Sequence, residues 1–345
     1  MRSGNFVGFD VGGTKALGVV VSTAPGDDGA APAYRILATA RKSSAGDGAV
    51  LTGTLGDLCE ELAAAAADGG TAADGPLRFD AVGLAVAGLA HRSGVVHFSP
   101  NLPDLLEFAL APALADELAG RLGYRPAVTL GNDATAGTWA EAHLGAGRGC
   151  DDFVFVALGT GIGTGFVVGG RLVVGTNGYA GESGHMVVDD SGPQHLTGVR
   201  GPWEYFASGK GLRRLGREAA RAGNFAAGLE LADGDAENVT SHHVHDTVAA
   251  GDEQALAILD EYCVGVALGI SNLVMILDPA RIVLGGGVAD IGEPLRARIE
   301  RELSATTVGA SHRPPPEVVM AELGTEASAV GAALMAADDG SGPDG

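Results

Sequence analysis

Cysteine is scarce in this chain: only Cys59, Cys150 and Cys263 occur among its 345 residues. They lie far apart in the sequence, and no Cys-x-x-Cys pair is present. This spacing argues against the disulfide framework of a small secreted domain. It favours reduced thiols in a cytoplasmic protein.

Basic residues are also few. Lys and Arg number 22 against 43 Asp and Glu, which gives a formal net charge of −21. A surface this acidic repels phosphate backbones and anionic lipids. We therefore expect no binding to nucleic acids or membrane surfaces, although a local basic pocket for a nucleotide is compatible with this charge.

No apolar run is long enough to cross a bilayer. The longest, residues 264–277, is too short for a membrane span and contains Ser271 and Asn272. Residues 1–5 lead directly into a strand-like stretch, so we expect no signal peptide and a cytoplasmic location.

The composition indicates a folded, globular chain. Hydrophobic residues make up 46% and charged residues 19%, and the length is that of about two domains. The 56 glycines predict many tight turns or close backbone approaches.

Two similar patterns of strands and helices follow one another, starting near residues 5 and 152, and each opens with strands around a glycine turn. We predict strands over 6–10, 17–22, 34–40, 79–86, 127–130, 153–158, 165–168, 171–174, 281–284 and 317–321. Helices are predicted over 51–67 (with a stop at 68–70), 105–122, 134–144, 253–277, 295–303 and 326–337. A loop over 24–33 and a disordered tail over 338–345 complete the pattern. It predicts an α/β fold with a small N-terminal lobe (1–125), a large C-terminal lobe (126–325) and a ligand cleft between them.

Three glycine-rich segments follow predicted strands. They contain Gly12, Gly13, Thr14 and Lys15; Gly159, Thr160 and Gly161; and Gly285, Gly286 and Gly287. Glycines allow backbone N–H groups to face a phosphate without an intervening Cβ, and Asp10 could hold Mg²⁺ through water. The first and the third segment alone are equally compatible with a structural turn. The second has four alternating glycines over 159–165, more than a structural turn needs, which favours close approach by a phosphate. Neither a Walker A motif nor a Rossmann motif followed by a helix is present.

Asp133 follows a short predicted strand and precedes a helix. By spacing alone it could be the N-cap of that helix. It could also be a general base that takes a proton from a hydroxyl group during phosphoryl transfer.

A second polar group lies further along the chain. Glu182 and His185 are separated by small residues, and Glu204 lies in Trp-Glu-Tyr. Carboxylate and imidazole groups suit the binding of neighbouring hydroxyl groups. A surface loop is the alternative interpretation.

The order of these motifs resembles the ROK family of repressors, open reading frames and sugar kinases, and most closely its bacterial glucokinase branch. The matching stretches are FDVGGTKALGVV, SPNL, GNDATAGTWAEAHLGAG, LGTGIGTG, GYAGESGHM, WEYFASG and LDPARIVLGGGVA, within residues 6–336. The resemblance implies a two-lobed ribonuclease H-like fold of the actin and hexokinase superfamily, in which helix 326–337 returns to the N-terminal lobe. It also implies that Asp133 is the catalytic base.

The resemblance assigns the remaining site residues as well. Sugar hydroxyls would be held by Asn101, Asn132, Asp133, Glu182, His185 and Glu204. The turns at 12–15 and 159–161 would hold ATP phosphates, and 285–287 would face the adenosine. A homodimer or homotetramer is implied.

One segment departs from the family pattern. The family usually carries a zinc-binding Cys-x-Cys-Gly-x-x-Gly-Cys, but His195, Thr197 and Pro202 stand at the three cysteine positions here. Thr and Pro cannot supply such ligands, and His185 with His195 would be too few. We predict no structural zinc, and the change leaves the identity of the sugar open. A histidine cluster at 242–245 is interpreted as a solvated helix start without a metal role.

These features favour an ATP-dependent hexokinase that acts on glucose with Mg²⁺. A kinase for mannose, an N-acetylhexosamine or fructose, or one that uses polyphosphate, is an alternative. A regulator that binds sugar without catalysis is another, although Asp10 comes so early that we expect no preceding DNA-binding segment.

Overall fold

The computed structural model describes residues 1–25, 33–67, 77–195 and 198–338. These residues form two compact units. Unit 1 contains residues 1–148, 172–180 and the described chain from 325 onward, and unit 2 contains 149–171 and 181–324. The division differs from the boundary expected after residue 125. The reason is that β7 (Ala127–Asn132) pairs in parallel with β4 (Ala81–Val86) and so belongs to the sheet of unit 1.

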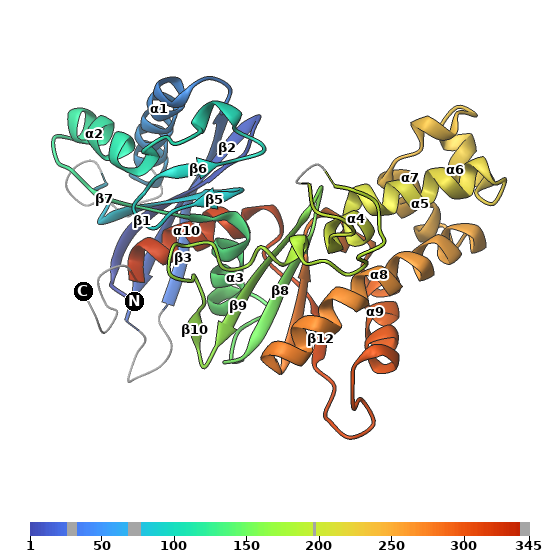
Figure 1. The fold of residues 1–345 in the computed structure, drawn as a ribbon. Helices are drawn as coiled ribbons and strands as arrows, with labels where there is room; N and C mark the ends of the chain where they lie inside the picture. Colours follow the sequence, from blue (N-terminus) through green and yellow to red (C-terminus); the bar gives the residue numbers. More distant parts are fainter. Residues whose placement is uncertain (26–32, 68–76, 196–197, 339–345) are drawn as a thin grey trace. The chain divides into compact units, whose positions relative to one another are not determined.

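The sheet of unit 1 has the strand order β3-β2-β1-β4-β7 (Figure 1). β1 (Gly4–Val11) and β2 (Lys15–Ala24) form the predicted antiparallel hairpin, and β3 (Ala33–Ser43) pairs with the outer edge of β2. β4 lies parallel to β1 on its other side. The carboxyl ends of β1, β4 and β7 therefore meet at one edge of the sheet.

One face of this sheet is covered by α1 (Gly48–Ala66) and α2 (Leu110–Leu122). Alternate residues of β1, namely Val7, Phe9 and Val11, point to this face and pack among buried leucines of both helices. The predicted start of the second helix at 105 was wrong. Pro103–Leu105 forms a separate 3-10 turn, η3, before α2 begins. Nearby, β5 (Leu89–Ala90) and β6 (Val96–Phe98) form a small sheet that we did not predict.

The opposite face is covered by α10 (Ala327–Asp338), which approaches the strands unusually closely. A Cβ added at Gly8 of β1 would lie 1.9 Å from the carbonyl oxygen of Ala329 on α10. At Gly83 of β4 it would lie 1.9 Å from the carbonyl oxygen of Ala332. Glycine is therefore required on both strands, and the final predicted helix lies in unit 1.

The same helix packs on α3 (Asp133–Leu144). A Cβ at Gly331 would lie 1.7 Å from the carbonyl oxygen of Ala136. The end of α10 is also fixed, since Asp338 accepts a hydrogen bond from Trp139 at 2.8 Å. Asp338 was expected in a disordered tail but is the last residue of α10, and the rest of that tail lies outside the described residues.

The sheet of unit 2 repeats the order of the first, as β10-β9-β8-β11-β12. β8 (Phe153–Leu158) and β9 (Ile162–Val168) form an antiparallel hairpin, with the short β10 (Arg171–Leu172) on its outer edge. β11 (Arg281–Gly285) and β12 (Glu317–Met320) continue in parallel. The two patterns in the sequence are thus two copies of one sheet topology.

Unit 2 surrounds its sheet with more helices than the sequence predicts. The unpredicted helices are α4 (Trp203–Ala207), α5 (Gly209–Arg221), α6 (Ala226–Leu231) and α7 (Ser241–Ala249), with short 3-10 turns at η4 (Ser183–His185), η5 (Ala236–Asn238) and η6 (Gly287–Ile291). A further turn, η7 (Gly324–Glu326), lies where the chain passes from unit 2 to unit 1. α7 begins at Ser241 and contains the whole histidine cluster at 242–245. The expected solvated start is only partly correct, because Val244 is buried and His242 is exposed.

The long helix α8 (Glu253–Leu277) agrees with its predicted bounds. By length and composition it could cross a membrane, since an 18-residue stretch of it has a mean hydropathy of 1.4. However, 61% of that stretch is buried inside the protein. A core helix of a folded domain passes the same test. Its buried side includes Tyr262, and Gly269 allows the ring of Trp203 to pack directly on the helix.

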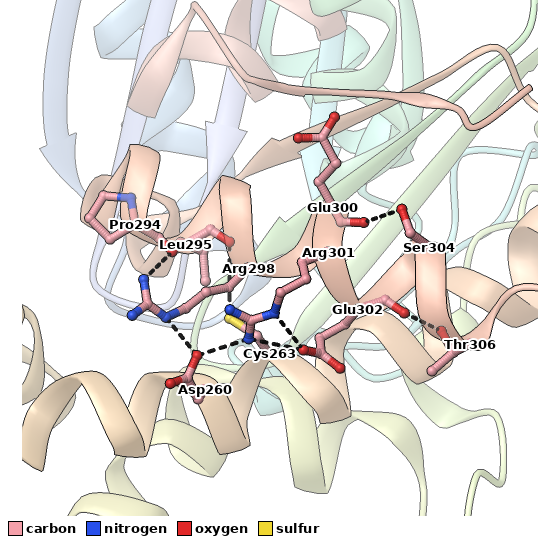
Figure 2. A network of polar contacts seen from close by, with 10 residues as sticks. All are labelled: Asp260, Cys263, Pro294, Leu295, Arg298, Glu300, Arg301, Glu302, Ser304 and Thr306. Carbon is pink, nitrogen blue, oxygen red and sulfur yellow. Dashed lines mark hydrogen bonds and ion pairs between the residues drawn. The ribbon is translucent and has the colours of Figure 1, made fainter. Parts of the chain in front are cut away.

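Ion pairs join α8 to α9 (Glu293–Thr306), as Figure 2 shows. Oδ1 of Asp260 on α8 accepts hydrogen bonds from Nε of Arg298 at 2.9 Å and from Nη2 of Arg301 at 3.0 Å. Partial burial opposes ionisation, but the two guanidinium groups hold the pKa of Asp260 below its usual value. This network fixes the packing of the two helices beside the sheet of unit 2.

Candidate active site

The first glycine turn joins β1 to β2 at the carboxyl end of β1. The N–H of Gly12 donates to the carbonyl oxygen of Lys15 at 3.1 Å, and the hydroxyl of Ser44 donates to the carbonyl oxygen of Gly12. A Cβ at Gly13 would lie 2.4 Å from the carbonyl oxygen of Asn101. The turn is therefore held from within the unit, and Asn101, a predicted sugar ligand, lies against it. Gly13, Thr14 and Lys15 are exposed.

Asp10 precedes this turn and lies on the face of the sheet that α10 covers. Burial and, to a smaller extent, the negative charge of Asp133 raise its pKa to about 6, although the charge of Lys15 opposes both. The carboxylate of Asp133 is thus close enough to disfavour the ionisation of Asp10. A pair of this kind attracts a cation.

Asp133 is the first residue of α3. The N-cap is Asn132, whose side-chain oxygen accepts from the N–H groups of Ala134 (2.9 Å) and Thr135 (3.2 Å). The alternative interpretation of Asp133 as the N-cap is therefore wrong. One carboxylate oxygen of Asp133 accepts from the N–H of Ala134 at 2.9 Å. Burial raises the pKa of Asp133, and the backbone N–H groups of Ala134 and of Asp133 itself partly oppose this rise.

Asn132 has a structural task beside any role in binding. Its Oδ1 caps α3, and its Nδ2 donates to the carbonyl oxygen of Gly88 at 3.3 Å. This bond ties the end of β7 to the loop after β4. A sugar ligand role for Asn132 stays a prediction.

The second glycine turn joins β8 to β9 in unit 2. Gly159 donates its N–H to the carbonyl oxygen of Gly161 at 3.0 Å and accepts from the N–H of Gly209 at 2.7 Å. Behind the turn, Oε2 of Glu204 accepts from the N–H of Ile162 at 3.0 Å. A Cβ at Gly161 would lie 2.2 Å from the same oxygen. Glycine is required at 161 because a predicted sugar ligand packs against it, while Thr160 is exposed.

The third glycine segment meets the second. Gly286 has a φ of 81°, and a Cβ there would lie 2.6 Å from the backbone of Leu158 at the end of β8. Gly287 is exposed, with open space where its Cβ would be. The structure thus brings the two segments predicted to bind phosphate and adenosine to the same edge of the sheet of unit 2.

Two acid–imidazole pairs lie together in unit 2. Nε2 of His185 is 3.7 Å from Oε2 of Glu182, and Nε2 of His195 is 3.5 Å from Oε1 of Glu204. The rings of His185 and His195 are 6.3 Å apart between centroids. The structure therefore brings Glu182, His185 and Glu204 into one group and adds His195 to them. The sequence treats His195 only as an inadequate zinc ligand, and its place in a substituted family motif was the one available signal.

The topology of the two repeated sheets can now be compared with known proteins. The profile of the ROK family matches residues 58–339. The chain belongs to the ROK family. The glucokinase of Thermotoga maritima is 37% identical over 259 residues, which cover 74% of this chain and 78% of that protein. A crystal structure of a ROK family glucokinase from Streptomyces griseus, in complex with glucose and AMPPNP, matches with a TM-score of 0.76 and 32% identity. The match covers 96% of this chain and 99% of the S. griseus chain. This similarity confirms the predicted fold class.

Other ROK members act on other sugars. The N-acetylmannosamine kinase of Citrobacter koseri is 34% identical over 264 residues, which cover 75% of this chain and 80% of that protein. Membership of the family alone therefore does not specify the sugar.

The altered ROK segment at 195–202 does not assemble a zinc site from its described residues. Pro202 is the N-cap of α4, and Leu196 and Thr197 lie outside the described residues. Across residues 1–25, 33–67, 77–195 and 198–338, no group of three or more His, Cys, Asp and Glu side chains is placed to hold a metal ion. The absence of structural zinc stays a prediction.

Proposed function

We propose that this protein transfers the γ-phosphoryl group of ATP to the 6-hydroxyl of a hexose, with glucose as the preferred acceptor. The broader prediction of a sugar kinase is confirmed by its ROK relatives. The observation that carries the proposal is Asp133. It stands at the carboxyl end of a parallel strand, it is not the helix cap, and its pKa is raised.

Asp133 acts as the general base. Its carboxylate takes the proton of the 6-hydroxyl while that oxygen forms a bond to the γ-phosphorus, and the bond from this phosphorus to the β–γ bridging oxygen breaks to release ADP. A carboxylate in water is a weak base for a hydroxyl. The burial that raises the pKa of Asp133 makes it stronger.

Asp10 suits a magnesium ion bound through water. Mg²⁺ keeps most of its waters and uses one or two carboxylates together with substrate phosphates. This agrees with Asp10, which has Asp133 nearby, and with the described part of the chain, where no three acidic, His or Cys side chains form a cage. When bound, the ion neutralises charge on the phosphates. The neighbouring turn at Gly12, Gly13, Thr14 and Lys15 binds phosphate through its N–H groups and the ammonium group.

The other ligand contacts lie in unit 2. Gly159, Thr160 and Gly161 bind phosphate, and Gly285, Gly286 and Gly287 leave room for the adenosine. Glu182, His185 and Glu204 hold sugar hydroxyls, assisted in unit 1 by Asn101 and Asn132. The glucose and AMPPNP in the related S. griseus enzyme support both ligand classes.

A kinase for another hexose is the second candidate. The observation in its favour is the altered segment 195–202, together with the N-acetylmannosamine kinase among the relatives. A regulator that binds sugar without catalysis is less consistent with Asp10 and Asp133, which such a protein does not need. We further propose a cytoplasmic homodimer or homotetramer that binds neither nucleic acids nor membranes, in keeping with the net charge of −21.

The test is ADP release from Mg·ATP across a panel of hexoses, with a control without sugar. Asp133→Asn should lower kcat by about 100-fold to 10,000-fold while sugar still binds. Asp104→Asn, which changes an exposed carboxylate of the same unit, should leave kcat unchanged. Near-full activity of Asp133→Asn would disprove the assignment of the base, and release with only a different hexose would replace glucose as the acceptor.

A further inference from the structure

The described residues of 187–202, a stretch that contains the altered segment 195–202, are joined by backbone contacts. Val187 pairs with Pro202, and Gln194 pairs with Arg200, both in antiparallel fashion. The N–H of His195 donates to the carbonyl oxygen of Val199 at 2.8 Å. The described residues of this segment thus form two arms of a hairpin, and the second arm leads directly into α4, which carries Glu204.

The hairpin places His195 against a predicted sugar ligand. Nε2 of His195 is 3.5 Å from Oε1 of Glu204, and each side chain is only 16% exposed. The other carboxylate oxygen, Oε2, accepts from the N–H of Ile162 at 3.0 Å. One carboxylate oxygen of Glu204 is therefore bound at the second glycine turn, between β8 and β9, and the other lies against the hairpin.

The same imidazole lies beside the second sugar-binding pair. Its ring is 6.3 Å from the ring of His185, which in turn contacts Glu182 at 3.7 Å. The imidazole of His195 thus lies close both to Glu204 and to the pair of His185 and Glu182.

We propose that His195 is a positioning residue for hexose binding, which orients Glu204 without a metal ion. The proposal rests on the proposed function, because it concerns the same sugar site. A zinc ion does not fit here, since the imidazole of His195 already faces Glu204 and Pro202 offers no ligand. Side chains that fix the orientation of a binding group are costly to remove even when they do not touch the ligand.

Two variants separate the parts of the imidazole. His195→Phe keeps a ring beside His185 but removes the group that faces Glu204. His195→Gln restores a donor of similar reach. His242→Phe is the matched control, because His242 is exposed and lies on α7, away from these contacts.

We expect His195→Phe to raise the KM for the hexose about 10-fold to 100-fold, as expected for the loss of one contact to a charged group, while the KM for ATP stays within about twofold. His195→Gln should recover most of the loss, and His242→Phe should match the wild type. In a Glu204→Gln background, the effect of His195→Phe should fall below about threefold, because the two changes remove one contact. Dialysis of the wild-type protein against a chelator, followed by return of Mg²⁺, should leave the KM for the hexose unchanged.

Independent effects of the two substitutions, an equal loss for ATP and hexose, or a KM that needs zinc would each overturn the proposal. Calorimetric binding of the hexose in the absence of ATP separates this result from the proposed function. If the wild type binds a hexose but releases no ADP, phosphoryl transfer is disproved, and the binding constants of the same variants still decide the role of His195. If the wild type shows neither binding nor turnover with any hexose, both are overturned.

Discussion

Replacement of Gly331 by alanine tests the close packing of α10 against α3. An added Cβ would lie 1.7 Å from the carbonyl oxygen of Ala136 and 2.3 Å from its carbon. Normal contacts need about 3.5 Å, so the two helices would have to separate by roughly 1–2 Å. Helix propensity alone favours alanine by about 1 kcal/mol. Overpacking of a close contact costs about 1–3 kcal/mol and often more when backbone must move, so we expect a net loss of about 2 kcal/mol in the free energy of unfolding.

Gly120 offers the matched control in the same unit. It lies on the exposed side of α2, with nothing within 4 Å of an added Cβ. Gly120→Ala should therefore raise the free energy of unfolding by about 0.5–1 kcal/mol. Urea unfolding followed by circular dichroism measures both changes. The change from glycine to alanine should thus lower the free energy of unfolding at position 331 and raise it at position 120.

The kcat of Gly331→Ala and of Gly120→Ala provides a second test. α3 begins with Asp133, so a shift of α3 should lower kcat in Gly331→Ala, whereas Gly120→Ala should keep the wild-type value. Equal stabilisation by both alanines would refute the close approach. A destabilised Gly331→Ala with unchanged kcat would refute the argument that this packing positions the base.

Three further predictions concern charge. Because the pKa of Asp10 is raised to about 6, the native state holds a proton between about pH 4 and pH 6 that the unfolded state releases. Without ligands, the free energy of unfolding should therefore fall by up to about 3 kcal/mol as the pH rises through this range. Asp10→Asn should flatten this dependence when urea unfolding is measured at several pH values. Asp260→Asn should cost about 1 kcal/mol, because it leaves Arg298 and Arg301 without their shared carboxylate, and the cost should shrink in 1 M NaCl; a cost that salt does not change would point to packing instead. Arg121→Ala should cost about 1–2 kcal/mol in thermal unfolding, since Arg121 contacts three carboxylates of α1 and α2; a shift in Tm below that of a surface Arg221→Ala control would contradict this.

Local patterns in the sequence predicted much of the fold. α8 agrees to the residue because Asp252 caps its start, and Asp278, in a left-handed conformation, ends it. The hairpin of β1 and β2 follows from two apolar runs around a glycine turn. The helices α4 to α7 were missed because they are short and gain their stability from tertiary packing, for instance of Trp203 against α8.

The candidate site also depends on tertiary contacts that local sequence patterns do not predict. Gly13 and Gly161 were expected to face phosphate, yet a neighbouring group, Asn101 in one case and Glu204 in the other, already requires glycine at each. Such close approaches depend on residues that are distant in sequence. The role of His195 could not be predicted for the same reason, because the hairpin that brings it to Glu204 forms through backbone hydrogen bonds that carry no side-chain pattern.

The position of α10 in the chain has a consequence for synthesis. The ribosome makes β1, β4 and α3 first, but the helix that covers their open face is made only after all of unit 2. Until then, small residues such as Gly8 and Gly83 leave an apolar sheet face in contact with water, where a chaperone or another nascent chain can bind it. Unit 2 can complete its own sheet earlier, so the surroundings of Glu204 should form before those of Asp133 in unit 1. In the folded protein, the backbone N–H of Arg2 donates to the carbonyl oxygen of Ala337 at 3.1 Å. Unit 1 is therefore complete only when its first and last described residues have come together.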